Sequence, residues 1–411
     1  MRRVRLTRRK LIVLVLLVGA LVEATAALAV LAKSGDNQPK LNTALPMHPV
    51  AGNFKPDGTK LADCSSQACF EQAFGNLAYY KGPKVALAAF AKKYGDYSDP
   101  GCHRVAHRIG SATLARNHGD VAKTFAEGSS ACFSGYYHGV LERSLLQVKS
   151  YEPATLGKVV RGLCTSVEKR FSMFLAYQCL HGLGHGLMIT TGYDLPLALK
   201  VCDRLSDYWQ TTSCNGGVFM ENIATFYGVT SRYLRDDDLL YPCDAVATPD
   251  KIKCYEISTS RVLPKVGWDW TKASQICASA ERGWSPTCFR SLGRDVSGVA
   301  HQRPAEIKRL CAYAKPFGGE VACIGGAAWA GAGNFKSGLR AARLCRAVTG
   351  KSRAVCYYRI GTVMVLFGPT AAKREADCRA ITGNAYDVKQ CVQGGKDYLA
   401  YAAGRDIRRY R

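Results

Sequence analysis

Apolar residues recur at helical spacing from about residue 63 to residue 405, in segments separated by short polar turns. Two kinds of segment alternate. PAEIKRLCAYA (304–314) and GLRAARLCRAV (338–348) run up to a cysteine, whereas CFRSLGRDVSGV (288–299) and CYYRIGTVMVLFG (356–368) start from one. The pattern predicts two helix types that alternate along an all-α chain.

The spacing of the cysteines gives the length of the repeat. In the second half of the chain, the first members of successive cysteine pairs are 33 or 34 residues apart, and the second members are 33 to 35 apart. A period near 34 residues is typical of two-helix solenoid repeats. Each predicted disulfide joins the end of the first helix to the start of the second. The regular pairs are Cys243/Cys254, Cys277/Cys288, Cys311/Cys323, Cys345/Cys356 and Cys378/Cys391, preceded by Cys202/Cys214 and the looser Cys164/Cys179.

Four earlier cysteines depart from this spacing. Cys64 and Cys69 are five residues apart and are predicted to cap the first turn. Cys102 and Cys132 both resemble the second member of a pair, and we predict that they join two neighbouring second-type helices. Eighteen cysteines without any CxxC exclude zinc ribbons, thioredoxin-like motifs and haem attachment. Their even number favours disulfides in an oxidising compartment, and the alternative is free buried thiols in a cytosolic protein.

In its period the chain resembles tetratricopeptide-type and Sel1-type helical repeats, and in its cysteines it resembles disulfide-stapled relatives of those. The resemblance covers about residues 63–405 and implies an α-solenoid. The tetratricopeptide signature residues are not present in order, and the resemblance implies no particular function.

The N-terminus is predicted to anchor the chain in a membrane. Residues 1–10 are strongly basic, and residues 11–32 are apolar with Glu23 as their only charge. Such a run spans about 30 Å of hydrocarbon as a helix, which indicates a signal-anchor with a cytoplasmic N-terminus and an extracytoplasmic bulk. A cleaved signal peptide ending near Ala32 is the alternative. TRRKLI also resembles a twin-arginine export signal.

Composition divides the rest into four parts. Residues 33–62 lack hydrophobic periodicity and are predicted to form a flexible linker. Residues 63–235 form helical repeats that contain histidine pairs, whereas the repeats of residues 236–405 contain none. Residues 406–411 are a basic tail.

The chain carries a formal net charge of +24. Residues 1–32 hold six Lys or Arg and one Glu, so residues 33–411 keep an excess of 19 positive charges. A field of this sign attracts an extracytoplasmic polyanion or an acidic partner, although each single Lys or Arg is better explained as solvated surface charge. Nucleic acid is disfavoured as a partner, because no nucleic-acid-binding motif is present and the predicted compartment is wrong.

Five of the eight histidines fall in three short stretches, each opening with a cysteine: CHRVAHRIG, CFSGYYHGVLE and CLHGLGHGLM. A fourth stretch, CNGGVFMEN, adds a glutamate. Side chains four residues apart share one face of a helix. The three glycines of HGLGHG cost a helix roughly 3 kcal/mol, which is tolerated where another backbone or a ligand comes close. A turn with locally hydrogen-bonded histidines is the alternative. The candidate residues are His103, His107, His138, Glu142, His181, His185 and Glu221.

The repeat period places these seven side chains on equivalent faces of successive helices, so they are expected to converge on the concave surface. Imidazoles with carboxylates favour a transition metal (Fe, Cu, Mn or Zn) over Ca or Mg. The number of ligands suits a dinuclear site, or one metal with Glu142 or Glu221 as catalytic base, and Tyr136 and Tyr137 are placed to hydrogen-bond ligands or substrate. Metal-activated oxygen or water would make the protein an oxidoreductase or a hydrolase.

Two alternatives to the metal site remain open at this point. The same residues would serve a metal-free acid–base site, for instance on a polysaccharide. They would also serve a purely structural hydrogen-bonded ladder between repeats. In that case the protein is a non-catalytic scaffold that binds a polyanionic or protein partner.

Overall fold

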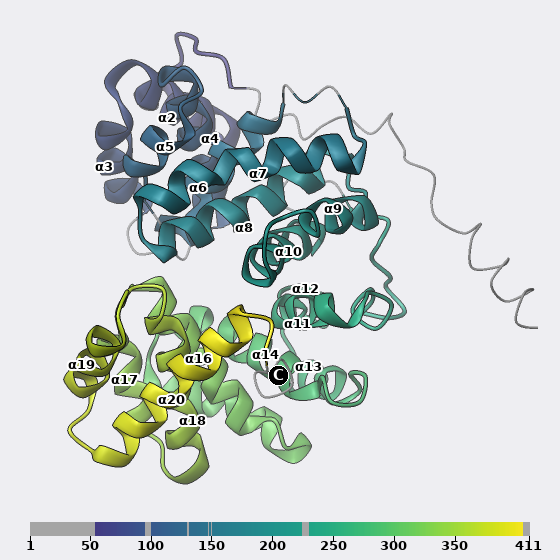
Figure 1. Ribbon diagram of the computed structural model, residues 1–411, viewed down its shortest axis with the longest axis vertical. Coiled ribbons are helices and arrows are strands. Elements are labelled where there is room, and N and C mark those ends of the chain that lie inside the picture. The colour runs from purple at the N-terminus through teal and green to yellow at the C-terminus, as the bar shows by residue number, and fades with distance from the viewer. Residues whose placement is uncertain are drawn as a thin grey trace, which may run out of the picture. The chain divides into compact units, whose positions relative to one another are not determined.

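A computed structural model of the chain describes residues 54–94, 100–129, 131–146, 148, 150–223 and 230–405. Within these ranges every regular element is a helix (Figure 1), as predicted. All eighteen cysteines form disulfides, with the nine pairings predicted from their spacing. The result is a disulfide-rich, repeat-like all-α fold.

The longer helices pack side by side in chain order and form one layer. Most of them carry the second cysteine of a disulfide. These helices are α2 (Gln67–Lys81), α4 (Pro100–Arg116), α6 (Ala131–Leu145), α8 (Met173–Thr190), α10 (Tyr208–Ile223), α14 (Ser285–Val299), α16 (Glu320–Asn334), α18 (Gly350–Met364) and α20 (Ala385–Ala402).

Shorter helices and turns connect the members of this layer. Between α10 and α14 the layer contains two short helices in place of one long helix, and the second holds a proline. The connecting elements are η1 (Leu61–Asp63), α3 (Pro83–Tyr94), α5 (Val121–Ala126), α7 (Pro153–Arg170), α9 (Leu195–Cys202), α11 (Thr248–Ile257), α12 (Thr259–Lys265), α13 (Trp270–Ala278), α15 (Pro304–Cys311), η2 (Ala312–Phe317), α17 (Gly338–Arg346) and α19 (Ala371–Ile381).

Glycines set the closest approaches within the layer. Four helix pairs, α4/α6, α8/α10, α14/α16 and α18/α20, meet at reciprocal glycines. A Cβ built on any of these glycines would lie only 1.8 to 2.0 Å from a backbone carbonyl oxygen of the partner helix. No side chain fits in that space, so the helices are in backbone contact. We call these residues the contact glycines: Gly110 and Gly139, Gly184 and Gly217, Gly293 and Gly326, Gly361 and Gly394.

Helix α8 lies between α6 and α10 and is enclosed by both. Its start is fixed by Ser172, whose hydroxyl accepts from the backbone N–H of Leu175. Every residue from Gln178 to Thr190 is buried. Gly184 faces α10, whereas Gly182 and Gly186 lie against backbone of α6. The prediction that these glycines admit a neighbouring backbone is confirmed.

Phe54, the first described residue, is already packed, although it precedes the predicted start of the repeats. Phe54 is 1% exposed, and its carbonyl accepts from the Arg143 guanidinium at 2.9 Å. The Gln72 amide donates to the carbonyl of Lys55 at 2.8 Å. Residues 54–62 therefore lie against the helices rather than in a free linker.

No helix in the described residues is both long enough and apolar enough to cross a membrane. The predicted signal-anchor, residues 11–32, and its basic flank lie outside the described residues.

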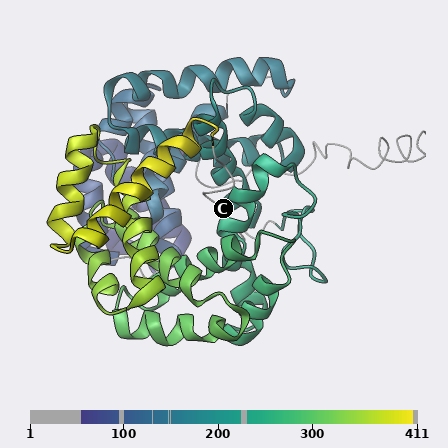
Figure 2. The same ribbon diagram turned by 60° about the horizontal axis from the view of Figure 1, so that its bottom comes forward.

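The last helix returns to the middle of the chain. The indole N–H of Trp209 in α10 donates to the Tyr398 hydroxyl of α20 at 3.0 Å, and the rings of Tyr208 and Tyr401 meet edge to face. Figure 2 shows the yellow ribbon of the last helix running back toward helices from the middle of the chain. The layer from α10 to α20 thus closes on itself through these aromatic contacts.

Candidate metal centre

The structure brings all seven predicted residues into one cluster between α4, α6, α8 and α10. Each of them is at most 8% exposed. The cluster is therefore buried inside the helix layer, and the expectation of an open concave surface is wrong. The contact glycines explain the difference, because backbones at this distance enclose the side chains between them.

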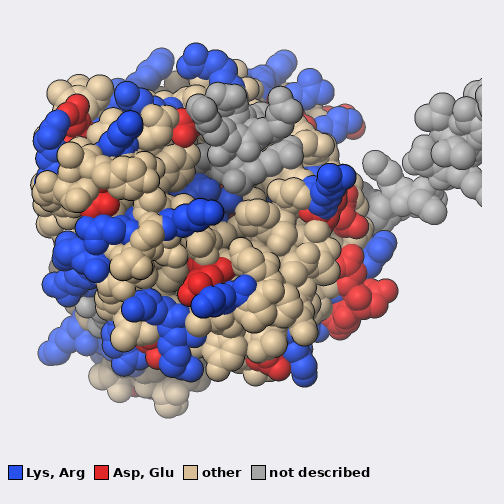
Figure 3. Space-filling view, turned by 90° about the horizontal axis from the view of Figure 1, so that it is seen from below, with Lys and Arg blue, Asp and Glu red and all other residues tan. Residues whose placement is uncertain are grey.

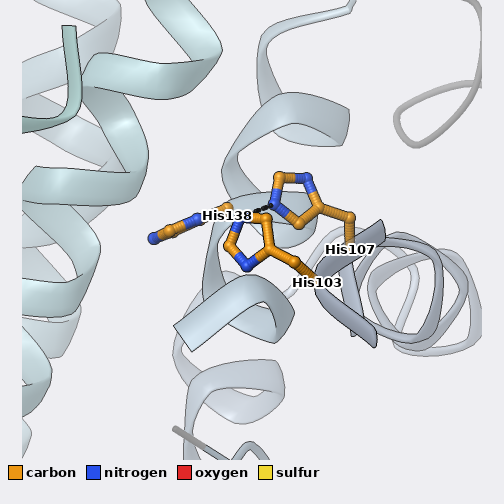
Figure 4. Close-up of side chains that lie close together, drawn as sticks. All are labelled: His103, His107 and His138. Atoms are coloured by element: carbon orange, nitrogen blue, oxygen red, sulfur yellow. Dashed lines mark hydrogen bonds between the residues drawn. The ribbon is translucent and has the colours of Figure 1, made fainter. Parts of the chain in front are cut away.

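His138 of α6 lies at the centre of the cluster. It forms one group of potential metal ligands with His103 and His107 of α4, and a second with His181 and His185 of α8. In each group, one ring nitrogen per residue lies within 4.8 Å of the others. Figure 4 shows the first group: His103 and His107 project from one helix and His138 from the helix beside it.

The protonation of His103 follows from its partner. Its Nδ1 lies 2.7 Å from the backbone oxygen of Cys132, which can only accept, so Nδ1 carries the proton. Its Nε2 therefore presents a lone pair. That lone pair faces Nε2 of His107 at 2.9 Å, and Nδ1 of His107 lies 2.6 Å from Oε1 of Glu142.

Two proton arrangements satisfy the contacts that link His103, His107 and Glu142. In the first, a protonated Glu142 donates to Nδ1 of His107, and Nε2–H of His107 donates to His103. In the second, Glu142 is ionised and accepts from Nδ1 of His107, so the two Nε2 atoms need either an added proton or a metal ion between them. Burial raises the pKa of Glu142 well above its usual range, and Glu221 adds to the rise while Arg108 opposes it. This favours the first arrangement without a cation.

The second arrangement matches the geometry of a metal ion. Two nitrogens bound at about 2.0–2.1 Å and at right angles lie about 2.9 Å apart, whereas tetrahedral ligands lie about 3.3 Å apart. The observed 2.9 Å between the Nε2 atoms of His103 and His107 equals the right-angle value. This distance fits neighbouring ligands of an octahedral or square-planar ion, and it equally fits the N–H···N hydrogen bond of the first arrangement.

On the other side of His138, a carboxylate orients His185. Nδ1 of His185 lies 2.8 Å from Oε2 of Glu221, and the Tyr193 hydroxyl donates to Oε1 of the same carboxylate at 2.8 Å. Metal-binding histidines are commonly held this way, with one nitrogen on a carboxylate and the other directed at the ion. Nε2 of His185 is buried without a hydrogen-bond partner among the described residues.

His138 itself has neither ring nitrogen hydrogen-bonded within the described residues, although it is only 1% exposed. Its ring stacks on His185 at 4.1 Å between centroids. Each unsatisfied buried polar group costs about 1–3 kcal/mol. Burial lowers the pKa of His138 far below its usual range, and the neighbouring histidines lower it further, so the ring is neutral. A neutral buried imidazole without partners is the form that binds metal.

The cluster should make the metal-free protein acid-labile. Burial lowers the pKa of His103 to about 4, and it also lowers the pKa of His138 and His181. Below about pH 6.5 these histidines bind more protons in the unfolded chain than in the folded chain, so they lower stability as pH drops from 6.5 toward 4, while the raised pKa of Glu142 acts in the opposite direction. His103 alone contributes a loss of about 3 kcal/mol.

Denaturant unfolding of the metal-free protein at pH 7.0 and 4.5 measures this loss. The variant His103→Asn should lose less stability over the same interval, because it removes the titrating group. Equal pH dependence of the variant and the parent would contradict the prediction.

Two other sequence expectations are resolved here. The hydroxyl of Tyr136 donates to the carbonyl of Thr124 at 2.9 Å, and the ring of Tyr137 stacks on Phe125, so both tyrosines are structural and do not face the site. Sequence reasoning missed Tyr193, which follows the end of α8 and carried no signal of its role.

No protein-family profile, curated protein sequence or solved structure matches the chain.

Proposed function

We propose that this protein is a membrane-anchored, extracytoplasmic α-solenoid of two-helix repeats that binds a transition-metal ion in the His/Glu cluster. One observation carries the proposal: buried His138 has no hydrogen-bond partner among the described residues and lies between two histidine pairs. A structural ladder would satisfy the groups it buries. The nine disulfides support an oxidising compartment, and the apolar run 11–32 supports anchoring.

The proposed ligands are the imidazoles, and the carboxylates orient them. His138 completes a three-histidine site with either neighbouring pair. A neutral imidazole has one lone pair, so His138 serves one pair at a time, and it would bind an ion on each side only after losing its N–H proton. Glu142 and Glu221 hold His107 and His185 through Nδ1. Imidazole ligands suit iron, copper, manganese and zinc alike, so all four metals are candidates.

Burial limits the chemistry that such a site supports. With every member at most 8% exposed, the cluster favours holding a metal ion, electron transfer or reaction with a small molecule such as oxygen or water. A metal-free acid–base site on a polysaccharide needs an open groove at these residues, so we do not retain it. In the proposal, ionised Glu142 accepts a hydrogen bond from Nδ1 of His107. Metal binding by His103 and His107 requires this ionised form, because Nε2 of His107 must then be free of its proton.

The polyanionic or acidic partner stays a prediction. Its basis is the excess of Lys and Arg. On the face in Figure 3 they gather mostly at the left and along the edges, with Asp and Glu among them and a broad area of other residues between.

Elemental analysis tests the proposal. The full-length, oxidised protein is reconstituted separately with iron, copper, manganese and zinc, freed of excess metal and analysed beside His181→Ala/His185→Ala. We expect metal near one or two ions per chain in the parent and a clear loss in the variant. The control variant His118→Asn/His301→Asn also removes two histidines, but both are exposed and lie outside the cluster. It should therefore retain the parent's metal. A parent that keeps none of the four metals would refute the metal site and favour the binding scaffold.

A further inference from the structure

One disulfide differs from the other eight in its surroundings. Sixteen of the eighteen cysteines are at most 4% exposed. Cys64 and Cys69 are the exceptions: they are half-buried at the surface, and they are only five residues apart in the sequence. Thiol–disulfide exchange requires that an attacking thiolate reaches one of the two sulfur atoms. Cys64–Cys69 is therefore the bond at which this reaction can take place while the protein stays folded.

The residues beside this bond leave it open to approach. Most of its exposed neighbours are small and uncharged, so their side chains do not cover the sulfur atoms. These neighbours are Ala62, Ser65, Ser66 and Ala68. Either a small thiol or the surface of a second protein can therefore come into contact with the disulfide.

The fold does not depend on this bond. Most of the buried disulfides join two helices, whereas this one joins the turn after η1 to the first turn of α2. The segment before it is held by hydrogen bonds of its own. The side-chain amide of Asn76 donates to the Asp57 carboxylate at 2.7 Å and to the Thr59 carbonyl at 2.9 Å. A short closed loop also contributes less stability than a long one. Opening the bond should therefore leave both sulfurs on a folded surface.

The two sulfur atoms are not equivalent. Cys69 is the third residue of α2, and the hydroxyl of Ser66, which caps this helix, accepts from the backbone N–H of Cys69 at 3.3 Å. The first N–H groups of a helix have no partner within it and carry partial positive charge. A cysteine thiolate near them is stabilised. Cys64 lies outside the helix, so Cys69 is the better leaving group when the bond is attacked.

We propose that Cys64–Cys69 is a thiol–disulfide exchange site that accepts electrons from an extracytoplasmic dithiol. One thiolate of the dithiol bonds to Sγ of Cys64, and the S–S bond breaks with its electron pair on Sγ of Cys69. The second thiolate of the dithiol then attacks the dithiol's own sulfur in the mixed disulfide and releases Cys64. The dithiol leaves as a disulfide, and its two electrons and two protons remain with the cysteine pair. The reaction uses no metal ion, so it does not rest on the His/Glu cluster.

Partial reduction tests the site. The full-length, oxidised protein is treated with limiting dithiothreitol at pH 7 without denaturant, and free thiols are alkylated and located by mass spectrometry of peptides. We expect Cys64 and Cys69 to be alkylated at least about 10-fold faster than any other cysteine, because exchange depends on access. The partly reduced protein should still unfold cooperatively on heating. Cys64→Ser/Cys69→Ser should fold and lack the fast phase. Reduction of all nine disulfides at one rate, or earlier reduction of another pair, would overturn the proposal.

Two single variants test which sulfur leaves. Cys64→Ser keeps a thiol at the start of α2, and Cys69→Ser keeps one in the turn before it. The rate of alkylation by iodoacetamide is followed against pH in each variant. The Cys69 thiol should reach half its maximal rate about one pH unit below the Cys64 thiol, which should behave like an ordinary thiol with half-reaction near about pH 8.5. The same midpoint in both variants, or a lower one for Cys64, would overturn the proposed step.

Discussion

Replacing His138 by Leu should abolish metal binding at both histidine pairs and leave the metal-free protein at least as stable as the parent. Leucine has a similar volume, and it removes two buried ring nitrogens that have no hydrogen-bond partner among the described residues. Loss of a residue that only orients a ligand costs roughly 10- to 100-fold in metal affinity, so loss of the shared ligand should cost more. Metal titration and urea unfolding of the two proteins measure these effects.

The variant Tyr193→Phe is the matched control for His138→Leu. It keeps all five imidazoles and removes one hydrogen bond to Glu221, at 2.8 Å. We expect it to weaken metal binding modestly, and only at the pair that contains His185. If His138→Leu instead retains metal and loses several kcal/mol of stability, then His138 is structural and the metal centre is wrongly placed.

Replacing Gly217 by Ala should lower the free energy of unfolding by about 3 kcal/mol or more, the range for overpacking a tight core. The added Cβ would lie 1.9 Å from the carbonyl oxygen of His181, so α8 and α10 must separate. Separation also moves Glu221 away from His185, and metal binding at that pair should fall with stability. Urea unfolding and metal titration test the two parts of this prediction.

The internal symmetry of the repeats provides the control. A Cβ on Gly394 meets the carbonyl of Tyr358 at the same 1.9 Å, but its helix pair lies outside the metal cluster. Gly394→Ala should therefore lose similar stability and keep its metal. Gly162 of α7 has open space around it, so Gly162→Ala should be neutral or stabilising by about 0.5–1 kcal/mol. Equal metal loss in Gly217→Ala and Gly394→Ala would show that stability alone controls binding.

The helix layer and the disulfides could be predicted because they follow from local spacing. A cysteine period near 34 residues fixes which helix each residue belongs to, and even the irregular pair Cys102–Cys132 followed from its position at two second-type helices. Once the histidines were assigned to successive helices, their convergence followed from the same period.

Burial and neighbouring charge could not be predicted in the same way. Nothing local distinguishes Arg290 or Arg359 from a solvated surface arginine, because their burial depends on helices far along the chain. The position of Phe54 under α2 and α6 depends on such contacts too. Tyr193 reaches Glu221 only because the turn after α8 directs it back to the cluster.

The contact between α20 and α10 changes how unfolding passes from one repeat to the next. In an open row of repeats, the terminal unit has one neighbour and frays first. Here Trp209 of α10 holds the final helix through a hydrogen bond, so we expect the repeats from α10 to α20 to unfold together. Trp209 is on the same helix as Glu221, the carboxylate that orients His185. Unfolding of the last helix, unlike a substitution that leaves it folded, therefore removes a packing contact from the helix that carries Glu221.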